Sequence, residues 1–455
     1  RVFSEYGDDS VAQLGGVHLA CEQASNLLTK ILEWGRLMAY LEQSTRYVTY
    51  DSRLGGRYRY HRDPEVLASS LGPRYVADLD RMFETYSELV PVLDAFYRER
   101  HPKEPADSDF VYRRAVRAKA LDALRGMLPA ASLSNLGIYG TGQGYEAMLL
   151  RMRASALPEA RNYAAMMLTE LRKVIPSFLT RVDRPDRGGE WTAYQEATAA
   201  ATASVAGSLF GAEEPEPRPE VTLVDYDPRA EDKLLAAIVY PHVDLPEDQV
   251  AARVARLSAD ERQAIVDAYV GERANRRHKP GRALERVSYR FDVLSDYGAF
   301  RDLQRHRMLT LQWQPLTPRH GFVLPDDVVG AGAADQYEAA MACSADLHDA
   351  LAGDFPAQAG YAVALAYRVR YSIDMNAREA LHMIELRTAP AGHASYRRVC
   401  QEMHRLIAEE AGHRNVAALM RFVDHDGPAP QTGLERLEGE RRAEARRSAH
   451  RSAHR

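Results

Sequence analysis

Residues 305–312 read Arg-His-Arg-Met-Leu-Thr-Leu-Gln, directly after a helix-like segment. Alone, three adjacent basic residues indicate a solvated, charged edge. A second stretch, residues 34–47, contains the complementary residues Glu42, Ser44 and Arg46. At the corresponding positions of the first stretch the sequence has Trp313, Pro315 and Thr317, and Trp34 and Gly35 replace Arg305 and His306. Each stretch has therefore lost what the other retains.

The same division recurs further along the chain. Arg125 stands shortly before Leu128-Pro129 in the first half, whereas the equivalent residue of the second half is Gly360. The second half in turn has Asn376-Ala377-Arg378 and ends the following helix with Arg387, where the first half has Thr141-Gly142-Gln143. An i, i+4, i+7, i+11 spacing places Asn376 and Arg387 on one helix face, where both could address one ligand.

Taken together, these pieces resemble the flavin-dependent thymidylate synthases, whose motif is R-H-R-x-x-[ST]-x-[NQ]-E-x-S-x-R. The resemblance covers both globular halves and implies a helix-rich α+β fold with two thymidylate-synthase-complementing-like domains in tandem. In that family the active site forms where subunits of a homotetramer meet. The resemblance therefore implies one composite site built from both halves, and a homodimer that mimics the tetramer.

The resemblance also implies a role for each retained residue. The residues expected to bind FAD are Arg305, His306, Arg307, Asn376, Arg378 and Glu285. Those expected to hold a pyrimidine nucleotide such as dUMP are Glu42, Ser44, Arg46, Arg125, Asp302 and Arg387. Among these, we expect catalytic roles for Arg387, Ser44 and Arg46.

The residue types suit this chemistry. Guanidinium groups are permanently charged and planar, so they can stabilise an anionic reduced flavin and clamp a phosphate. Asn376 can donate and accept hydrogen bonds. In the family a nicotinamide such as NADPH reduces FAD, methylenetetrahydrofolate supplies the carbon, and no enzyme thiolate is required. We accordingly expect Cys21, Cys343 and Cys400 to be core thiols.

Departures from the motif leave the reaction open. Asp302 replaces a Gln that contacts the nucleotide in the family, so a related substrate is an alternative to dUMP. Together with Trp313 and Pro315, Asp302 also favours a second hypothesis, a catalytically degenerate flavin- or nucleotide-binding, regulatory protein of the same fold.

Composition shifts divide the chain into four parts. We expect a first domain at 1–190, an Ala- and Pro-rich linker at 191–219, a second domain at 220–424 and an Arg-rich tail at 425–455. Apolar periodicity predicts helices at residues 11–38, 113–127, 159–178, 336–351, 377–386 and 395–409. Short strands are expected at residues 220–226 and within 355–371.

The composition excludes several classes of protein. A balance of 45% apolar and 27% charged residues, with no apolar run of about 18 residues, predicts a globular protein with no membrane span. Three scattered thiols favour the cytoplasm and no metal site. A net charge of −5 makes a nucleic-acid partner unlikely, and the Arg-rich tail is interpreted as solvated. The chain starts at Arg1 without a signal peptide, and we expect missing N-terminal residues.

Overall fold

The structure, a computed structural model, describes residues 11–45, 48–105 and 107–425. Its residues fall into two compact units, each discontinuous in sequence. Unit 1 comprises Arg1–Asp94, Ala120–Pro217 and Leu316–Tyr367, and unit 2 comprises Ala95–Lys119, Arg218–Pro315 and Arg368–Arg455. Unit 1 thus includes a segment from the second half of the sequence. Among the described residues no helix is both long and apolar enough to cross a membrane.

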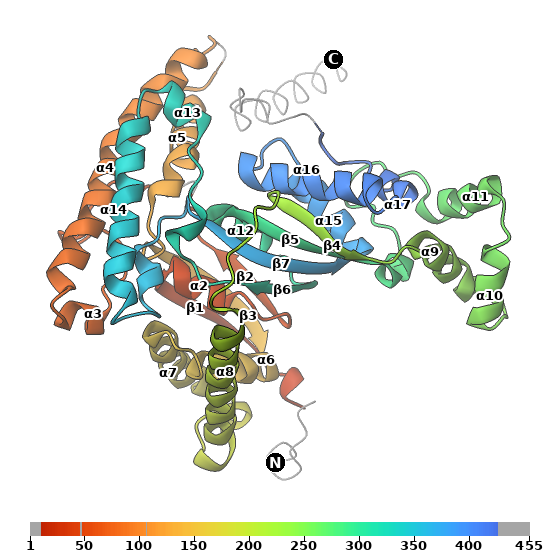
Figure 1. Cartoon of the computed structure of the whole chain (residues 1–455), viewed down its shortest axis with the longest axis horizontal. Helices are drawn as coiled ribbons and strands as arrows, with labels where there is room; N and C mark the ends of the chain where they lie inside the picture. The colour runs from red at the N-terminus through yellow and green to blue at the C-terminus, as the bar shows by residue number, and fades with distance from the viewer. Residues whose placement is uncertain (1–10, 46–47, 106, 426–455) are drawn as a thin grey trace, which may run out of the picture. The chain divides into compact units, whose positions relative to one another are not determined.

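Unit 1 is built around a three-stranded antiparallel sheet of order β1-β3-β2 (Figure 1). Its strands and longer helices are β1 (Gly16–Ser25), α2 (Asn26–Leu32), β2 (Met38–Glu42), α3 (Pro64–Ala68), β3 (Leu133–Thr141), α6 (Gly142–Arg153), α7 (Pro158–Arg172), α8 (Glu190–Phe210), α13 (Asp326–Gly330) and α14 (Ala334–Ala352). Short turns of helix are η1 (Val11–Gln13), η2 (Arg125–Met127), η3 (Pro176–Leu179), η4 (Pro185–Gly189), η7 (Pro318–His320) and η8 (Ala359–Ala362). Two helices, α4 (Gly72–Arg100) and α5 (Asp109–Leu124), are divided between the units.

Unit 2 has a four-stranded antiparallel sheet of order β4-β5-β7-β6. Its elements are β4 (Val221–Tyr226), α9 (Ala230–Val239), η5 (Tyr240–His242), α10 (Glu247–Val254), α11 (Ala259–Val270), η6 (Arg282–Arg286), β5 (Ser288–Asp296), α12 (Tyr297–Leu303), β6 (Leu309–Trp313), β7 (Arg368–Asn376), α15 (Ala377–Arg387), α16 (Ala394–Glu409) and α17 (Arg414–Ala418). The core of the unit lies between the sheet and the helices α12, α15 and α16, whose inward residues are buried.

Both units repeat one topology, strand–helix–strand followed by a central strand that leads directly into a helix. In unit 1 the elements are β1-α2-β2 with β3-α6, and in unit 2 they are β5-α12-β6 with β7-α15. Each of the four strand-to-helix junctions is capped by a side-chain oxygen that accepts from the backbone N–H three residues later. The tandem, helix-rich α+β architecture expected from the sequence is confirmed.

A buried side-chain pair fixes the same junction in both halves, with the chemistry exchanged. The Ser25 hydroxyl, at the start of α2, donates to Glu159 on α7 at 2.6 Å. At the matching positions of the second half, the Ser395 hydroxyl on α16 donates to Asp296 at the start of α12. Donor and acceptor have therefore changed places while the contact between the two elements is kept.

Within unit 1, two equivalent segments pair around a local two-fold axis. The alignment that matches Arg125 with Gly360 also matches Pro129 with Ala364, and these two residues form an antiparallel bridge. The surrounding hydrogen bonds come in symmetric pairs. Ala130 N–H donates to Val363 O at 2.8 Å, and Leu365 N–H donates to Leu128 O at 2.9 Å. Such self-complementary pairing is what two fused copies of one domain would form about a dimer axis.

Two secondary-structure predictions are wrong in part. Residues 16–25, predicted as part of a helix, form β1, because this segment pairs with β3 along most of its length. Residues 359–362, predicted within a strand, form the turn η8, and the strand β7 begins only at Arg368. The helices predicted at 113–127, 159–178, 336–351, 377–386 and 395–409 and the strand at 220–226 are confirmed in their main extent.

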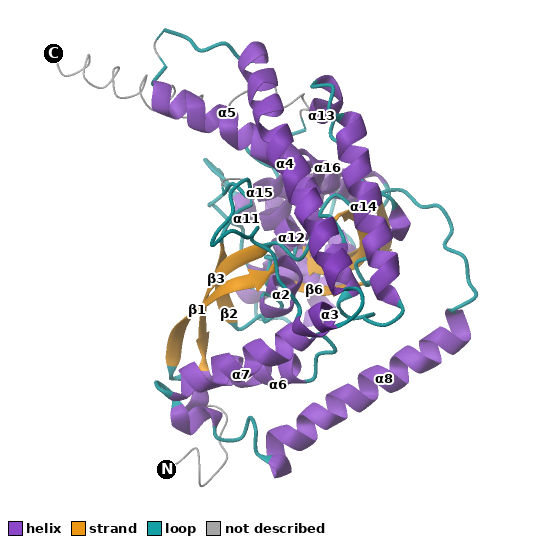
Figure 2. Ribbon diagram, turned by 90° about the vertical axis from the view of Figure 1, so that its left-hand side faces the viewer, coloured by secondary structure: helices purple, strands orange, loops and turns teal. Residues whose placement is uncertain are grey.

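The segment expected to link the two domains contains a long, solvated helix. Helix α8 extends away from α6 and α7 (Figure 2), and among its residues only Thr192 is buried. Its many alanines give high helix propensity, which favours a helix even though almost all of its residues are exposed. Residues 213–219, where Pro alternates with Glu, form no helix or strand. Most of the Arg-rich tail lies outside the described residues.

Candidate functional site

In unit 2 the expected residues gather in two groups along helix α15. Arg387, the last residue of α15, lies with Asp302 on α12 and with Arg305 and His306 in the loop that follows α12. Asn376, Arg378 and Glu285 lie at the first turn of α15. Asn376 and Arg387 lie at opposite ends of α15, whose eleven residues span about 16 Å at 1.5 Å per residue. The structure therefore does not bring Asn376 and Arg387 to one point, although they share a helix face.

His306 is the centre of the first group, and its ring is enclosed by protein, with 7% of the residue exposed. Its Nδ1 lies 2.8 Å from Oε1 of Glu379, and its Nε2 lies 3.1 Å from Nε of Arg387. Because an arginine Nε–H only donates, Nε2 must be the acceptor and must carry no proton. The ring proton is therefore on Nδ1, from which it is donated to Glu379.

The pKa values of this pair agree with a neutral imidazole beside a carboxylate. Burial, together with the positive charge of Arg387, lowers the pKa of His306 to about 4 against the opposing effect of Glu379. Burial alone would raise the pKa of Glu379, but hydrogen bonds from His306 and His382 outweigh burial and lower it to about 2. At neutral pH His306 is uncharged and Glu379 is ionised.

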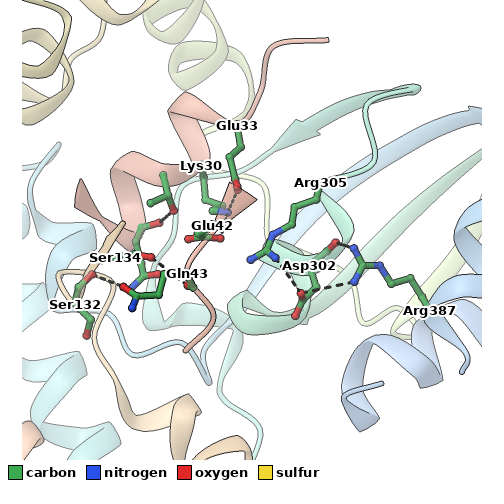
Figure 3. Close-up of polar contacts among 11 residues, drawn as sticks. Lys30, Glu33, Glu42, Gln43, Ser132, Ser134, Asp302, Arg305 and Arg387 are labelled. Atoms are coloured by element: carbon green, nitrogen blue, oxygen red, sulfur yellow. Dashed lines mark hydrogen bonds and ion pairs between the residues drawn. The ribbon is translucent and has the colours of Figure 1, made fainter. Parts of the chain in front are cut away.

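Arg387 is held from several sides. Besides the bond to His306, its Nη2 donates to the backbone carbonyl oxygen of Asp302, and its Nη1 lies 3.7 Å from Oδ1 of the same residue. The guanidinium also lies 5.3 Å from the ring centre of Tyr396. Asp302 in turn lies between Arg387 and Arg305, whose Nη1 is 3.9 Å from the carboxylate (Figure 3). The negative charge of Asp302 is thus balanced by two guanidinium groups.

The second group is more open to solvent. Arg378, with 40% of its side chain exposed, donates to Oε1 of Glu285 at 3.3 Å and to the carbonyl oxygen of Pro280 at 3.4 Å. Glu285 also accepts from Arg282, and this hydrogen bond is the main cause of its lowered pKa. Oδ1 of Asn376 caps α15 by accepting from the Glu379 N–H at 2.9 Å. The Asn376 amide NH₂ has no partner among the described residues, so it can donate to a ligand.

A cavity of about 390 Å³ lies next to this second group. Ser288, which pairs with Asn376 in the sheet, and Asp374 are part of its lining. Three aspartates there, Asp225, Asp227 and Asp374, outnumber the two arginines Arg286 and Arg290. The charge of the cavity does not favour a phosphate.

In unit 1 one of the expected nucleotide residues, Glu42, belongs to a buried ion cluster (Figure 3). Glu42, at the end of β2, lies 3.3 Å from Nζ of Lys30, which also pairs with Glu33. All three side chains are almost completely buried. Lys30 is thus one contact of Glu42 within unit 1. Charges so buried are stable only when paired in good geometry.

The structure describes only some of the other residues expected to hold the nucleotide. Ser44 is half-buried two residues after β2. Arg125 is buried in η2, with its Nε 3.8 Å from Asp122. Arg46 lies outside the described residues. In unit 2, Arg307 is exposed two residues before β6.

His306, Glu379 and His382 have the composition of a metal site, and their candidate ligand atoms lie within 4.8 Å of one another. A metal on Nδ1 of neutral His306 would require the ring proton on Nε2, where the Nε–H of Arg387 already points. The arrangement therefore favours a proton, not a metal, between His306 and Glu379.

Sequence reasoning missed four charged or titratable residues of these groups: Lys30, Glu33, Glu379 and His382. Glu379 directly follows Asn376-Ala377-Arg378 in the chain, so its position in the first helical turn could have revealed it. Lys30 and Glu33 could be found only through the contact of α2 with β2, which no local pattern predicts. The three cysteines are buried, free thiols as expected. Burial raises the pKa of Cys21 and Cys400 to about 12 and that of Cys343 to about 11.

Comparison with known proteins agrees with the duplicated fold. The family model described as "Thymidylate synthase complementing protein" matches residues 1–177 and 222–411. The "UPF0159 protein" of Chlamydia muridarum is 36% identical over 98% of this chain and 83% of its own length. A UPF0159 protein of Chlamydia pneumoniae is 36% identical over 90% of this chain and 77% of its own, and one of Thermoplasma acidophilum is 30% identical over 93% and 88%. The chain belongs to the thymidylate synthase complementing protein family, as a diverged member with two domains in tandem.

Proposed function

We propose that this protein is an FAD-dependent enzyme that transfers a hydride or a one-carbon unit to a pyrimidine nucleotide such as dUMP, or to a related small anion. The observation that carries the proposal is the pair of groups along α15, in which Arg378 bonds Glu285 and Arg387 bonds His306. The first domain, with Glu42, Ser44, Arg46 and Arg125, is proposed as the nucleotide side. NADPH and methylenetetrahydrofolate are the proposed co-substrates.

The residues at the first turn of α15 suit a flavin. The half-exposed guanidinium of Arg378 and the amide NH₂ of Asn376 both present donors there. Flavin and phosphate oxygens accept such bonds, and a permanent positive charge favours an anionic ligand. When bound, FAD supplies the hydride chemistry. Arg305 and Arg307 are proposed to contact the flavin or its phosphates as well.

Arg387 and Asp302 are proposed to meet the substrate. Since Asp302 lies between two arginines, its charge does not prevent an anionic substrate from approaching Arg387. An acidic side chain at this position can also accept from a donor edge, such as an exocyclic amine. A substrate with such an edge is therefore the proposed alternative to dUMP.

The absorbance spectrum of the purified protein tests the flavin proposal. We expect bound flavin in the wild type. We expect Arg378→Ala to lose the flavin, because the variant lacks the guanidinium proposed to bind FAD at the first turn of α15. Arg405→Ala is the matched control, since Arg405 forms exposed ion pairs on α16 with Glu402 and Glu409. A colourless wild-type protein that does not respond to added FAD would refute the proposal.

A catalytically degenerate binding or regulatory protein is the second candidate. The observation in its favour is the buried ion cluster, in which Glu42, an expected substrate contact, is already paired with Lys30. Anaerobic addition of NADPH, with and without dUMP, separates the two candidates. Reduction of bound flavin supports the enzyme, whereas a flavin that stays oxidised with every candidate substrate supports the degenerate protein.

A further inference from the structure

We infer that Glu379 is a positioning residue for Arg387, which it orients through the ring of His306. The inference rests on the proposed function, in which Arg387 contacts the substrate. Glu379 itself would touch neither flavin nor substrate. Three observations support this role. They are the direction of the hydrogen bonds, the rigid position of the Glu379 carboxylate, and the absence of the same three side chains from the first domain.

The direction of the hydrogen bonds is fixed by Arg387. Its Nε–H can only donate, so the His306 ring must offer Nε2 as an acceptor and keep its proton on Nδ1. That Nδ1–H needs an acceptor inside the protein, because the ring is buried. Oε1 of Glu379, at 2.8 Å, is that acceptor. Loss of the carboxylate would allow the ring to turn or to change tautomer, and Arg387 would lose its support.

Glu379 is itself held rigidly. Its backbone N–H donates to the capping oxygen of Asn376, and its carboxylate lies 3.5 Å from Nδ1 of His382. Glu379 and Arg387 belong to the first and last turns of the same helix, α15. The His306 ring therefore bridges the Glu379 carboxylate in the first turn of this helix and the Arg387 guanidinium in its last turn.

The hydrogen-bond chain leaves part of Arg387 available for a ligand. A guanidinium has five N–H donors. Among the described residues, Nε donates to His306 and Nη2 donates to the Asp302 carbonyl oxygen. These two bonds do not use the other N–H groups of the guanidinium. They do fix the plane of the guanidinium, and therefore the directions in which the other N–H groups point. Orientation of this kind is valuable, because a misplacement of about 1 Å can cost about 100-fold in rate.

The first domain cannot form this chain of hydrogen bonds. In the alignment that matches Arg125 with Gly360, the positions of Glu379 and Arg387 are occupied by Gly144 and Met152. Gly35 likewise stands where the second domain has His306. The support of Arg387 is thus confined to the domain proposed to bind flavin.

The test compares full-length wild-type protein with Glu379→Ala, Glu379→Gln and the control Glu402→Ala, which removes an exposed glutamate from α16. Long-range ¹H–¹⁵N NMR of labelled histidine reports the His306 tautomer, and exchange of the Arg387 Nε–H with water reports its hydrogen bond. Calorimetry with dUMP as the probe reports binding. Thermal unfolding checks that each variant is folded.

We expect the wild-type His306 ring to be the Nδ1–H tautomer. In Glu379→Ala the Nε2–H form should appear, the Arg387 Nε–H should exchange about tenfold faster, and dUMP should bind roughly 10- to 100-fold more weakly. Glu379→Gln keeps an acceptor oxygen and should retain the tautomer with a smaller loss of affinity. Glu402→Ala should match the wild type in all three measurements.

An unchanged tautomer and unchanged exchange in Glu379→Ala would overturn the inference, and so would changed NMR signals with wild-type affinity for dUMP. A wild-type protein that binds neither FAD nor dUMP would instead sink the proposed function. In that case the two NMR measurements still decide whether Glu379 orients Arg387.

Discussion

At the scale of single residues, the buried pair His306–Glu379 makes stability depend on pH. The pKa of His306 is about 4 in the folded protein, below the value of about 6.5 for an exposed histidine. The unfolded chain therefore binds more protons between these values, and stability is lost as the pH falls from about 6.5 toward 4. Glu379, whose pKa is lowered to about 2, adds a further loss as the pH falls below its ordinary value. The charged or titratable groups that face the ring are Glu379, His382 and Arg387.

Urea unfolding at a series of pH values between 4.5 and 7 measures this effect. One proton accounts for at most about 1.4 kcal/mol per pH unit. His306→Asn removes the titrating ring, so its unfolding free energy should vary less with pH than that of the wild type over this range. His242→Asn is the comparison variant, because His242 is an exposed residue of η5. Identical pH slopes for the wild type and His306→Asn would contradict the burial of a neutral His306.

The residues of the site were predictable from sequence to the extent that they belong to the motif. The motif predicts Arg305, His306, Arg378 and Arg387 in the second half of the chain. In the structure Arg387 bonds His306, Arg378 bonds Glu285, and Arg305 lies beside Asp302. Glu379 and Lys30 were not expected, because a supporting residue is recognised by what it contacts and not by the ligand it binds. The same limit applies to His306, whose two ring nitrogens are both engaged inside the protein.

At the scale of elements, the pairs Ser25–Glu159 and Ser395–Asp296 have exchanged hydrogen-bond donor and acceptor. We therefore predict that the hydroxyl and the carboxylate of a pair can exchange places, whereas two carboxylates in one pair destabilise the protein. Ser25→Asp would place a carboxylate beside buried Glu159, and the repulsion should destabilise the protein by roughly 2–4 kcal/mol. Adding Glu159→Ser recreates the arrangement of the second half and should recover part of the loss. Recovery is partial because the Tyr361 hydroxyl also donates to Glu159.

Chemical denaturation of the single and double variants gives the coupling energy between the two sites. The control is Ser87→Asp, on a half-buried residue of α4 whose hydroxyl bonds only its own helix. Additive effects of Ser25→Asp and Glu159→Ser would show that the two positions do not form an interchangeable pair.

Elements with a local signal were predictable from sequence, whereas those defined by long-range pairing were not. The apolar periodicity of 336–351 and 395–409 matches helices α14 and α16. Residues 16–25 carry a helix-like pattern, yet they form β1 because β3, more than a hundred residues away, offers a strand to pair with. The turn η8 escaped prediction for a related reason, since one of its residues, Tyr361, takes part in the two-fold pairing with residues 126–131.

At the scale of the whole molecule, the division of the sequence into halves differs from the division of the structure into units. Residues 316–367 lie in unit 1, although they follow the expected linker. Helices α4 and α14 lie side by side (Figures 1 and 2), and Arg74 on α4 donates to the carbonyl oxygen of Asp346 on α14 at 3.1 Å. Unit 1 therefore cannot be completed by the first half of the chain alone.

A chain divided within the extended residues 213–219 tests this dependence. Residues 1–214 expressed alone would lack the segment that contains the buried residues Tyr361, Val363 and Leu365 and that pairs with residues 126–131. The exposed apolar surface and the lost hydrogen bonds should leave this fragment aggregated or without a cooperative unfolding transition. When fragment 1–214 is co-expressed with residues 215–455, the two fragments should form a soluble complex, because the cut lies in a segment that belongs to no helix or strand. Size-exclusion chromatography and thermal unfolding measure both outcomes. A fragment 1–214 that unfolds cooperatively, with the melting temperature of the intact chain, would show that residues 316–367 are dispensable for unit 1.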